Sequence, residues 1–119
     1  MVYNKAMPET MPDARIVFTS TDSAEKAHAL ARALVEQRLA ACVNIVERAH
    51  SIYRWQGAVE ETNEWLLLIK TEATALPQLE QTLHALHSYE LPEFLVLAAE
   101  SGSAAYLRWI SDSISGKEK

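Results

Sequence analysis

Two histidines, His84 and His87, are the residues whose type and spacing most directly suggest chemistry. Residues three apart on a helix lie on the same side, so the two imidazoles can be neighbours. Glu90 and Glu93 follow closely in the sequence. Because imidazole is a common ligand of zinc and copper, these four side chains are candidate ligands of a divalent metal ion. The alternative is that both histidines are solvated near a helix end, where imidazolium interacts favourably with the helix dipole.

The segment Ser51–Gly57 combines aromatic and basic residues, with Tyr53, Arg54 and Trp55 in a row. These residue types are favoured at the centres of protein interfaces, and aromatic rings also stack on nucleobases. The net charge of -5 argues against a nucleic-acid partner, because phosphate binding requires a surplus of Lys and Arg. The interface interpretation is therefore favoured, and simple strand alternation is a third option.

Cys42 is the single cysteine, so the chain cannot form an internal disulfide. A buried free cysteine often acts as a small hydrophobic residue, whereas a thiolate nucleophile needs a base or a positive neighbour. His28 and His50 are candidates for that base, but no spacing demands either. We expect Cys42 to be structural.

Lys70 lies at the end of a predicted strand. Three roles are open to it there: it is solvated, it pairs with Glu64 or Glu72, or it reaches a small anionic ligand. The chain lacks a Ser-His-Asp order, a CxxC pair and a phosphate loop, and it has only three glycines. We therefore expect a protein that is not an enzyme.

The pattern of apolar residues predicts the elements that position these side chains. The predicted strands cover Arg15–Thr21, Leu39–Tyr53, Val59–Thr71 and Phe94–Ala99. A first helix, beginning at Asp22 or Ser23, carries the apolar stripe Ala27, Leu30, Ala31, Leu34 and Val35. A second, from about Thr74 to His87, carries Leu76, Leu79, Leu83 and Leu86, and a short third helix runs from Ala105 to Ser113.

This order of elements predicts an α+β fold, a ferredoxin-like βαββαβ sandwich with an antiparallel sheet and an extra C-terminal helix. Two helices cover one face of such a sheet, and the other face stays bare in a monomer. The second and third strands form a hairpin longer than the sheet can pair. Because bare faces and edges associate, we expect a homo-oligomer.

The 119 residues, 49% of them hydrophobic, are the usual size of one domain with a real core. We expect a flexible leader over residues 1–14, a single domain over 15–114 and a polar tail over 115–119. No apolar run reaches the roughly 20 residues of a membrane helix, and the N-terminus does not resemble a signal peptide. We expect a cytoplasmic protein with no membrane or nucleic-acid partner.

Four segments in one order resemble the CutA family of divalent-ion tolerance proteins, and the resemblance extends from about Arg15 to Ile114. They are Leu39–Asn44, Ser51–Gly57, Glu64–Thr71 and His87–Glu93. The resemblance implies a ferredoxin-like fold, a tight homotrimer around a three-fold axis, and a link to tolerance of copper and other divalent cations.

The family's residues carry over unevenly. Thr19 stands where some bacterial relatives place a copper-ligand cysteine, and Leu86 with His87 stands where they have a His-His pair. The resemblance therefore implies only weak copper binding here. The residues that match the family and are candidates for lining clefts between subunits are Tyr53, Trp55, Lys70, His87, Tyr89, Pro92 and Glu93.

These observations predict a trimeric divalent-cation tolerance or response protein that binds ions such as copper weakly near subunit clefts, through His87 with Glu90 or Glu93. One alternative is a small-molecule signalling module like the P-II regulators, which need a long flexible loop. Another is a protein-assembly scaffold without a metal ligand.

Overall fold

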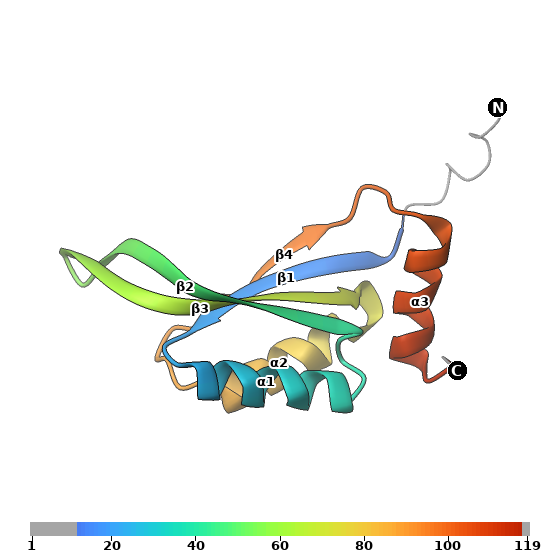
Figure 1. Cartoon of the computed structure of the whole chain (residues 1–119), viewed down its shortest axis with the longest axis horizontal. Helices are drawn as coiled ribbons and strands as arrows, with labels where there is room; N and C mark the ends of the chain where they lie inside the picture. Colours follow the sequence, from blue (N-terminus) through green and yellow to red (C-terminus); the bar gives the residue numbers. More distant parts are fainter. Residues whose placement is uncertain (1–11, 118–119) are drawn as a thin grey trace.

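A computed structural model describes residues 12–117 and shows a four-stranded sheet with helices on one face and at one end (Figure 1). Residues 1–11 of the predicted leader over 1–14 and the last two residues of the predicted tail lie outside the described part. The elements are β1 (Ala14–Thr21), α1 (Ala24–Glu36), β2 (Cys42–Trp55), β3 (Ala58–Glu72), a 3-10 turn (Ala73–Ala75), α2 (Leu76–Leu86), β4 (Leu95–Ala98) and α3 (Ala104–Ser115).

The strand order in the sheet is β2-β3-β1-β4, and all neighbours are antiparallel. β1 pairs along its whole length with the second half of β3, from Ala14 opposite Glu72 to Thr21 opposite Trp65. β4 pairs with the other edge of β1. This is the predicted ferredoxin-like order with the extra C-terminal helix, so the predicted fold class is confirmed.

Helices α1 and α2 lie on one face of the sheet because each has an apolar stripe (Figure 1). The Ser23 side chain caps α1 by accepting a hydrogen bond from the Lys26 amide, a contact that typically stabilises a helix by about 1 kcal/mol. The core between helices and sheet contains Val17, Ala27, Leu30, Ala31, Leu34, Leu39, Ala40, Leu67, Ile69, Leu79 and Leu83.

The predicted burial of the last residue in each apolar stripe is wrong. Val35 is 41% exposed and Leu86 is 53% exposed, although Leu34 and Leu83 in the same last turns are fully buried. α2 also ends at Leu86, one residue earlier than expected, and His87 has extended backbone angles. His87 is therefore the first residue of the loop rather than part of the helix.

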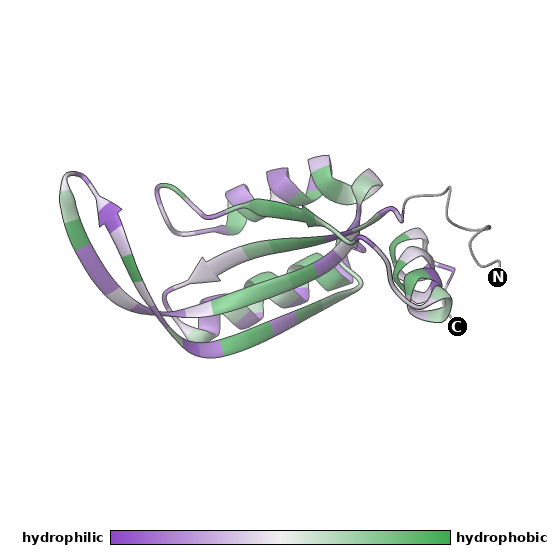
Figure 2. Ribbon diagram, turned by 90° about the horizontal axis from the view of Figure 1, so that it is seen from above, coloured by the Kyte–Doolittle hydropathy of each residue, from purple (hydrophilic) through white to green (hydrophobic). Residues whose placement is uncertain are grey.

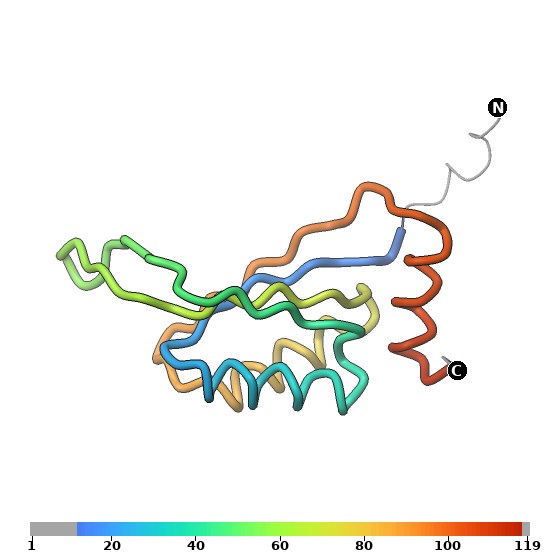
Figure 3. Tube along the Cα trace, viewed as in Figure 1, coloured from blue at the N-terminus to red at the C-terminus, as the bar shows by residue number. Residues whose placement is uncertain are grey.

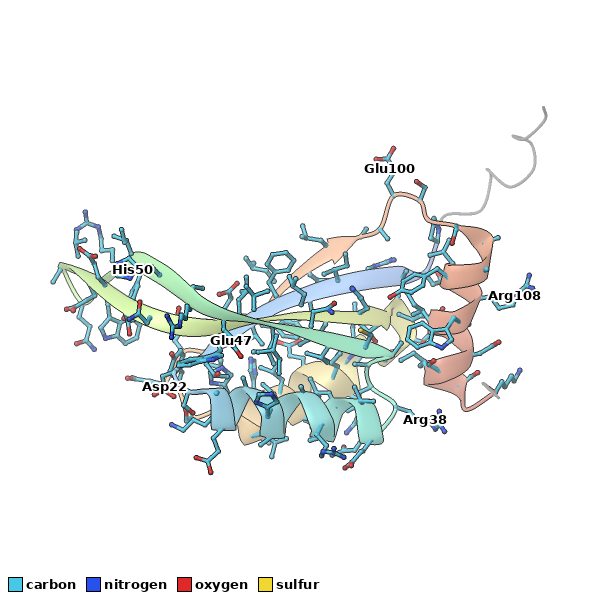
Figure 4. The ribbon with its side chains drawn as sticks, viewed as in Figure 1. Asp22, Arg38, Glu47, His50, Glu100 and Arg108 are labelled. Atoms are coloured by element: carbon cyan, nitrogen blue, oxygen red, sulfur yellow. The ribbon has the colours of Figure 1, made fainter. Side chains whose placement is uncertain are left out.

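The opposite face of the sheet has no helix over it, as expected (Figure 1). Leu95 and Leu97 of β4 are 62% and 51% exposed on this side. α3 instead packs across one end of the sheet and buries Ile110. Arg38, after α1, donates from Nη1 to the carbonyl of Ser113 at 2.8 Å, which links the first and last helices (Figure 4).

The hairpin of β2 and β3 extends beyond the rest of the sheet as an arm (Figure 3). A β-bulge between Val46 and Ala49 separates the arm from the sheet, with Arg48 at a φ of 62°. The arm closes through Gln56 and Gly57, both with positive φ. Apolar and polar residues alternate along the arm (Figure 2). No helix within residues 12–117 is long and apolar enough to cross a membrane.

Candidate functional site

A cleft of about 640 Å³ lies between the hairpin arm and the loop over residues 87–94 that joins α2 to β4. Its residues come from β1, the arm, β3, the loop and the start of β4. They are Ser20, Ser51, Tyr53, Arg54, Trp55, Glu64, Tyr89, Glu90, Leu91, Pro92, Glu93, Phe94 and Leu95.

Glu64 forms the floor of this cleft and is only 8% exposed. It lies on β3 beside the bulge, opposite Ala49 of β2. The Tyr89 hydroxyl donates to Glu64 Oε2 at 2.7 Å, and the Ser20 hydroxyl donates to the same oxygen at 3.3 Å. Burying a carboxylate is costly without such donors, so these two hydroxyls account for the position of Glu64.

Glu93 is the second carboxylate at the floor. Its pKa is raised above the ordinary value, first by burial and then by the negative charge of Glu64, while the nearby Ser20 hydroxyl partly opposes the shift. Ser20 therefore lies between two carboxylates that repel each other. Glu90 is exposed at the rim.

Tyr89 is held above this floor. Burial, followed by the hydrogen bond to Glu64, raises the pKa of the Tyr89 hydroxyl far above its usual range. The phenol therefore stays protonated and acts as a donor to Glu64 at any physiological pH.

The arm supplies an aromatic wall. Residues opposite each other on paired strands share a face, and residues two apart on one strand do so too. Because Ala49 lies opposite Glu64, Ser51, Tyr53 and Trp55 face the same side as that carboxylate. Arg54, between Tyr53 and Trp55, also lines the cleft.

His87 supports the loop through both ring nitrogens. Nε2 donates to the carbonyl of Ser20 at 2.7 Å, and Nδ1 accepts from the amide of Tyr89 at 3.1 Å. A carbonyl only accepts and an amide only donates, so these partners assign the neutral tautomer protonated at Nε2. The ring also packs on Tyr89, with centroids 4.8 Å apart. His87 thus positions Tyr89 and has no ring nitrogen free for a metal ion.

His84 is exposed on α2 and packs edge-on against Phe94, with ring centroids 5.9 Å apart. Within residues 12–117, no group of three or more His, Cys, Asp and Glu side chains is arranged to hold a metal ion. One chain therefore does not bring the four predicted ligands His84, His87, Glu90 and Glu93 together as a metal centre.

Lys70 and Cys42 lie away from the cleft, toward the other end of the sheet, where they are cross-strand partners. Lys70 Nζ donates to Asn44 Oδ1, rather than pairing with Glu64 or Glu72. The half-buried Cys42 thiol lies 3.9 Å from the same oxygen. The predicted structural role of Cys42 fits this position, and an interface role for Lys70 stays a prediction.

The structure places Tyr53, Trp55, Tyr89 and Pro92 together in this cleft of a single chain, and their predicted place in clefts between subunits stays a prediction. Sequence reasoning missed Ser20 and Glu64. The available signal for Glu64 was an acidic residue directly before the apolar run Trp65–Ile69 of a strand. Nothing in the sequence marked Ser20.

These features define a small ferredoxin-like α+β domain with a long hairpin arm and an acidic, aromatic cleft at the base of that arm. Residues 15–113 match the family described as "CutA1 divalent ion tolerance protein". The chain belongs to this family.

Similar proteins carry names of the same family. The "Divalent-cation tolerance protein CutA" of Thermus thermophilus is 48% identical over 98 residues, which are 82% of this chain and 95% of that protein. "Protein CutA" of Mus musculus is 41% identical over 93 residues, 78% of this chain. The match spans only 52% of the mouse protein.

Solved structures show the same fold. CutA from Xylella fastidiosa superposes with a TM-score of 0.83 at 41% identity, covering 86% of this chain and 98% of that one. The Thermus thermophilus protein superposes with a TM-score of 0.80 at 48% identity, covering 82% of this chain and 94% of that one.

Proposed function

We propose that this divalent-cation tolerance protein acts as a homotrimer and binds divalent cations weakly at the cleft below the hairpin arm. The observation that carries this proposal is the pair of carboxylates, Glu64 and Glu93, on either side of Ser20. In the part of the chain that the structure describes, neither carboxylate forms a salt bridge with a cationic side chain. The floor of the cleft is therefore an uncompensated negative site that a cation would stabilise.

The donor set favours weak binding. Carboxylate and hydroxyl oxygens suit hard cations, and a single described chain offers no complete group of ligands. The cation would keep part of its water shell and be held mainly by charge. Of the expected ligands, we propose Glu93 and Glu90 as the cation-facing residues, joined by Glu64. Coordination through His87 would require breaking one of its two hydrogen bonds.

The trimer is supported by apolar residues that one chain leaves uncovered. Ile52 and Val59 on the arm are 65% and 62% exposed. The edges of the sheet, β2 and β4, are unpaired on their outer sides. A closed ring of copies would cover the arms and edges without leaving a new edge, and it would place a neighbour's arm near each cleft.

Sizing coupled to light scattering tests the oligomer. We expect three times the mass of one chain, with and without added divalent ions. A monomeric mass would contradict the trimer and favour the assembly-scaffold alternative, which draws on the same exposed surfaces.

Calorimetric titration with Mg²⁺, Zn²⁺ and Cu²⁺ tests the site. Glu93→Gln should weaken binding of each ion, whereas Glu100→Gln should not, because Glu100 lies in the loop between β4 and α3 (Figure 4). His87→Ala separates direct coordination from loop support: Cu²⁺ binding should weaken more than Mg²⁺ binding if His87 is a ligand, and both should weaken equally if it only supports the loop. Identical titrations for all variants would reject the cleft as the cation site.

The P-II-like alternative has less support. Its long flexible loop has no counterpart in the hairpin, which closes through the two residues Gln56 and Gly57. A cleft with three glutamates also repels the phosphates of a nucleotide.

A cytoplasmic location and a non-enzymatic role remain part of the proposal. The relatives' names describe tolerance rather than a reaction. They also differ in location, since the protein of Arabidopsis thaliana is called chloroplastic and the Archaeoglobus fulgidus structure is called periplasmic.

A further inference from the structure

The cleft is much larger than a metal ion needs. Its volume of about 640 Å³ lies within the range of about 300–1,000 Å³ that is typical of pockets for small organic molecules. A divalent cation at the carboxylates would occupy only the floor. The rest of the cleft therefore requires an explanation of its own.

The walls are apolar and aromatic. Tyr53 and Trp55 come from the arm, while Tyr89, Leu91 and Phe94 come from the facing loop. A hydrated metal ion would bury little of this apolar surface. A carbon chain would stabilise its complex by roughly 25 cal/mol for each Å² of apolar area that it buries, and aromatic faces also attract organic cations.

The floor selects the charge of the occupant. Glu64 is 8% exposed and lies close to the apolar walls. Both donors to Glu64, Ser20 and Tyr89, approach the same oxygen, Oε2. Oε1 accepts no side-chain hydrogen bond from Ser20 or Tyr89, so an incoming N–H group has an acceptor available.

Arg54 is the one basic residue of the lining, beside the three glutamates Glu64, Glu90 and Glu93. In the part of the chain that the structure describes, it forms no salt bridge with Glu64 or Glu93. A cleft with buried negative charge at one end and aromatic walls along its length is complementary to a positive head on an apolar chain.

We propose that this cleft binds a primary alkylammonium ion, with its ammonium group between Glu64 and Glu93 and its aliphatic chain against Tyr53 and Trp55. The ammonium group supplies up to three N–H donors, which carboxylates accept in charge-assisted hydrogen bonds. This inference concerns the same cleft as the proposed function, but it does not require that metal ions bind there.

The test is a nuclear magnetic resonance titration of the full chain with n-butylammonium chloride, following the indole N–H of Trp55. That resonance is assigned by its absence from the Trp55→Phe variant. Two probes accompany it. 1-Butanol has the same carbon chain without the charge, and ammonium chloride has the charge without the chain. We expect saturable shifts with butylammonium, and affinities at least about tenfold lower for both partial probes.

Two variants locate the binding site. Glu64→Gln keeps an oxygen for Ser20 and Tyr89 but removes the charge, and it should lower butylammonium affinity roughly tenfold or more. Glu93→Gln, on a less buried side chain, gives a second reading if Glu64→Gln reduces folding. Glu100→Gln is the matched control and should bind like the unmodified protein.

Each outcome is decisive. Equal affinity for butanol and butylammonium, no saturable shift, or equal loss in Glu64→Gln and Glu100→Gln would overturn the inference. Titration of the same samples with Mg²⁺ and Zn²⁺ keeps the two proposals separate. Amine binding without metal binding would contradict only the metal site, whereas metal binding without amine binding would contradict only this inference.

Discussion

The hydroxyl of Tyr89 donates to Oε2 of Glu64 across 2.7 Å, and this hydrogen bond joins the loop after α2 to strand β3 at the floor of the cleft. The two residues are 25 positions apart in sequence. His87 holds the backbone of Tyr89 in place from the other side. The position of the loop, and with it the shape of the cleft, therefore depends on these polar contacts together with the packing of Phe94 against the core.

Replacing Tyr89 with Phe removes the shortest hydrogen bond to Glu64 and keeps the ring. Hydrogen bonds to a charged partner typically contribute about 1.5–3 kcal/mol, and loss of a donor leaves the carboxylate less well solvated. We expect the free energy of unfolding to fall by about 1–2 kcal/mol in urea denaturation. Tyr106→Phe is the control, because Tyr106 lies exposed on α3 and should change stability by less than about 0.5 kcal/mol. Equal stability of the two variants would show that the hydrogen bond contributes nothing.

Much of the fold could be predicted because its signals are local. The apolar stripes of α1 and α2 and the β-branched residues of β1 identify their elements directly. The strand order follows from the order of elements together with the preference for packed helix and sheet layers. The errors fall at the ends of helices, such as Val35 and Leu86, where burial of a stripe residue depends on its tertiary neighbours and not on its spacing alone.

The candidate site was predictable only in part. Tyr53, Trp55 and Tyr89 stood out by residue type, whereas Ser20 and Glu64 act through contacts between strands distant in sequence. His87 shows most clearly where prediction of the site from the sequence fails. Its spacing from His84 suggested a shared helix face, but the helix ends at Leu86. The extended backbone at His87 then directs its ring toward Ser20 rather than toward His84.

Replacing Thr19 should raise the stability of the protein, whereas replacing Tyr89 should lower it. Its side chain is fully buried, and in the described structure its hydroxyl has no hydrogen-bond partner. Thr19→Val replaces that hydroxyl with a methyl group of similar shape and removes the desolvation penalty. We expect stability to rise by about 1 kcal/mol, measured by thermal or urea denaturation.

Thr71→Val is the matched control for Thr19→Val. Thr71 is equally buried, but its hydroxyl donates to the carbonyl of Leu39 at 2.7 Å. This change should lower stability by about 1–2 kcal/mol because the Leu39 carbonyl loses its donor. The same sign for both variants would mean that the Thr19 hydroxyl has a partner in solution.

The turn of the hairpin arm gives a prediction about backbone strain. Gln56 and Gly57 have φ values of 50° and 86°, as in the two-residue turns that favour Asn followed by Gly. Gln56→Asn should therefore stabilise the protein by several tenths of a kcal/mol, roughly the difference between residues in this left-handed region.

Gly57→Ala should have the opposite effect. A Cβ atom at Gly57 meets no other atom within 4 Å, so its cost is conformational alone, roughly 1–2 kcal/mol. Urea denaturation of both variants measures these differences. A neutral Gly57→Ala change would show that the turn has another conformation in solution.

His50 makes the arm sensitive to pH. Its ring lies on the arm (Figure 4), with Nδ1 3.0 Å from Asn63 Oδ1 and Nε2 2.7 Å from Glu61 Oε1. Both partners are acceptors, so the geometry is satisfied fully only by the imidazolium form. The hydrogen bonds to Asn63 and Glu61 raise the pKa of His50 above its ordinary value of 6.5.

A raised folded-state pKa means that the folded chain holds the proton more tightly than the unfolded chain does. This contribution to stability is complete below the unfolded pKa near 6.5 and is lost as pH rises through the folded pKa. We expect the urea midpoint of the protein, relative to that of His50→Gln, to decrease between about pH 6 and pH 8. Glu61→Gln should lower the His50 pKa measured by nuclear magnetic resonance titration of its ring. A His50 pKa that is identical with and without the Glu61 carboxylate would show that the pair does not form, since an ion pair must shift the titration of its members.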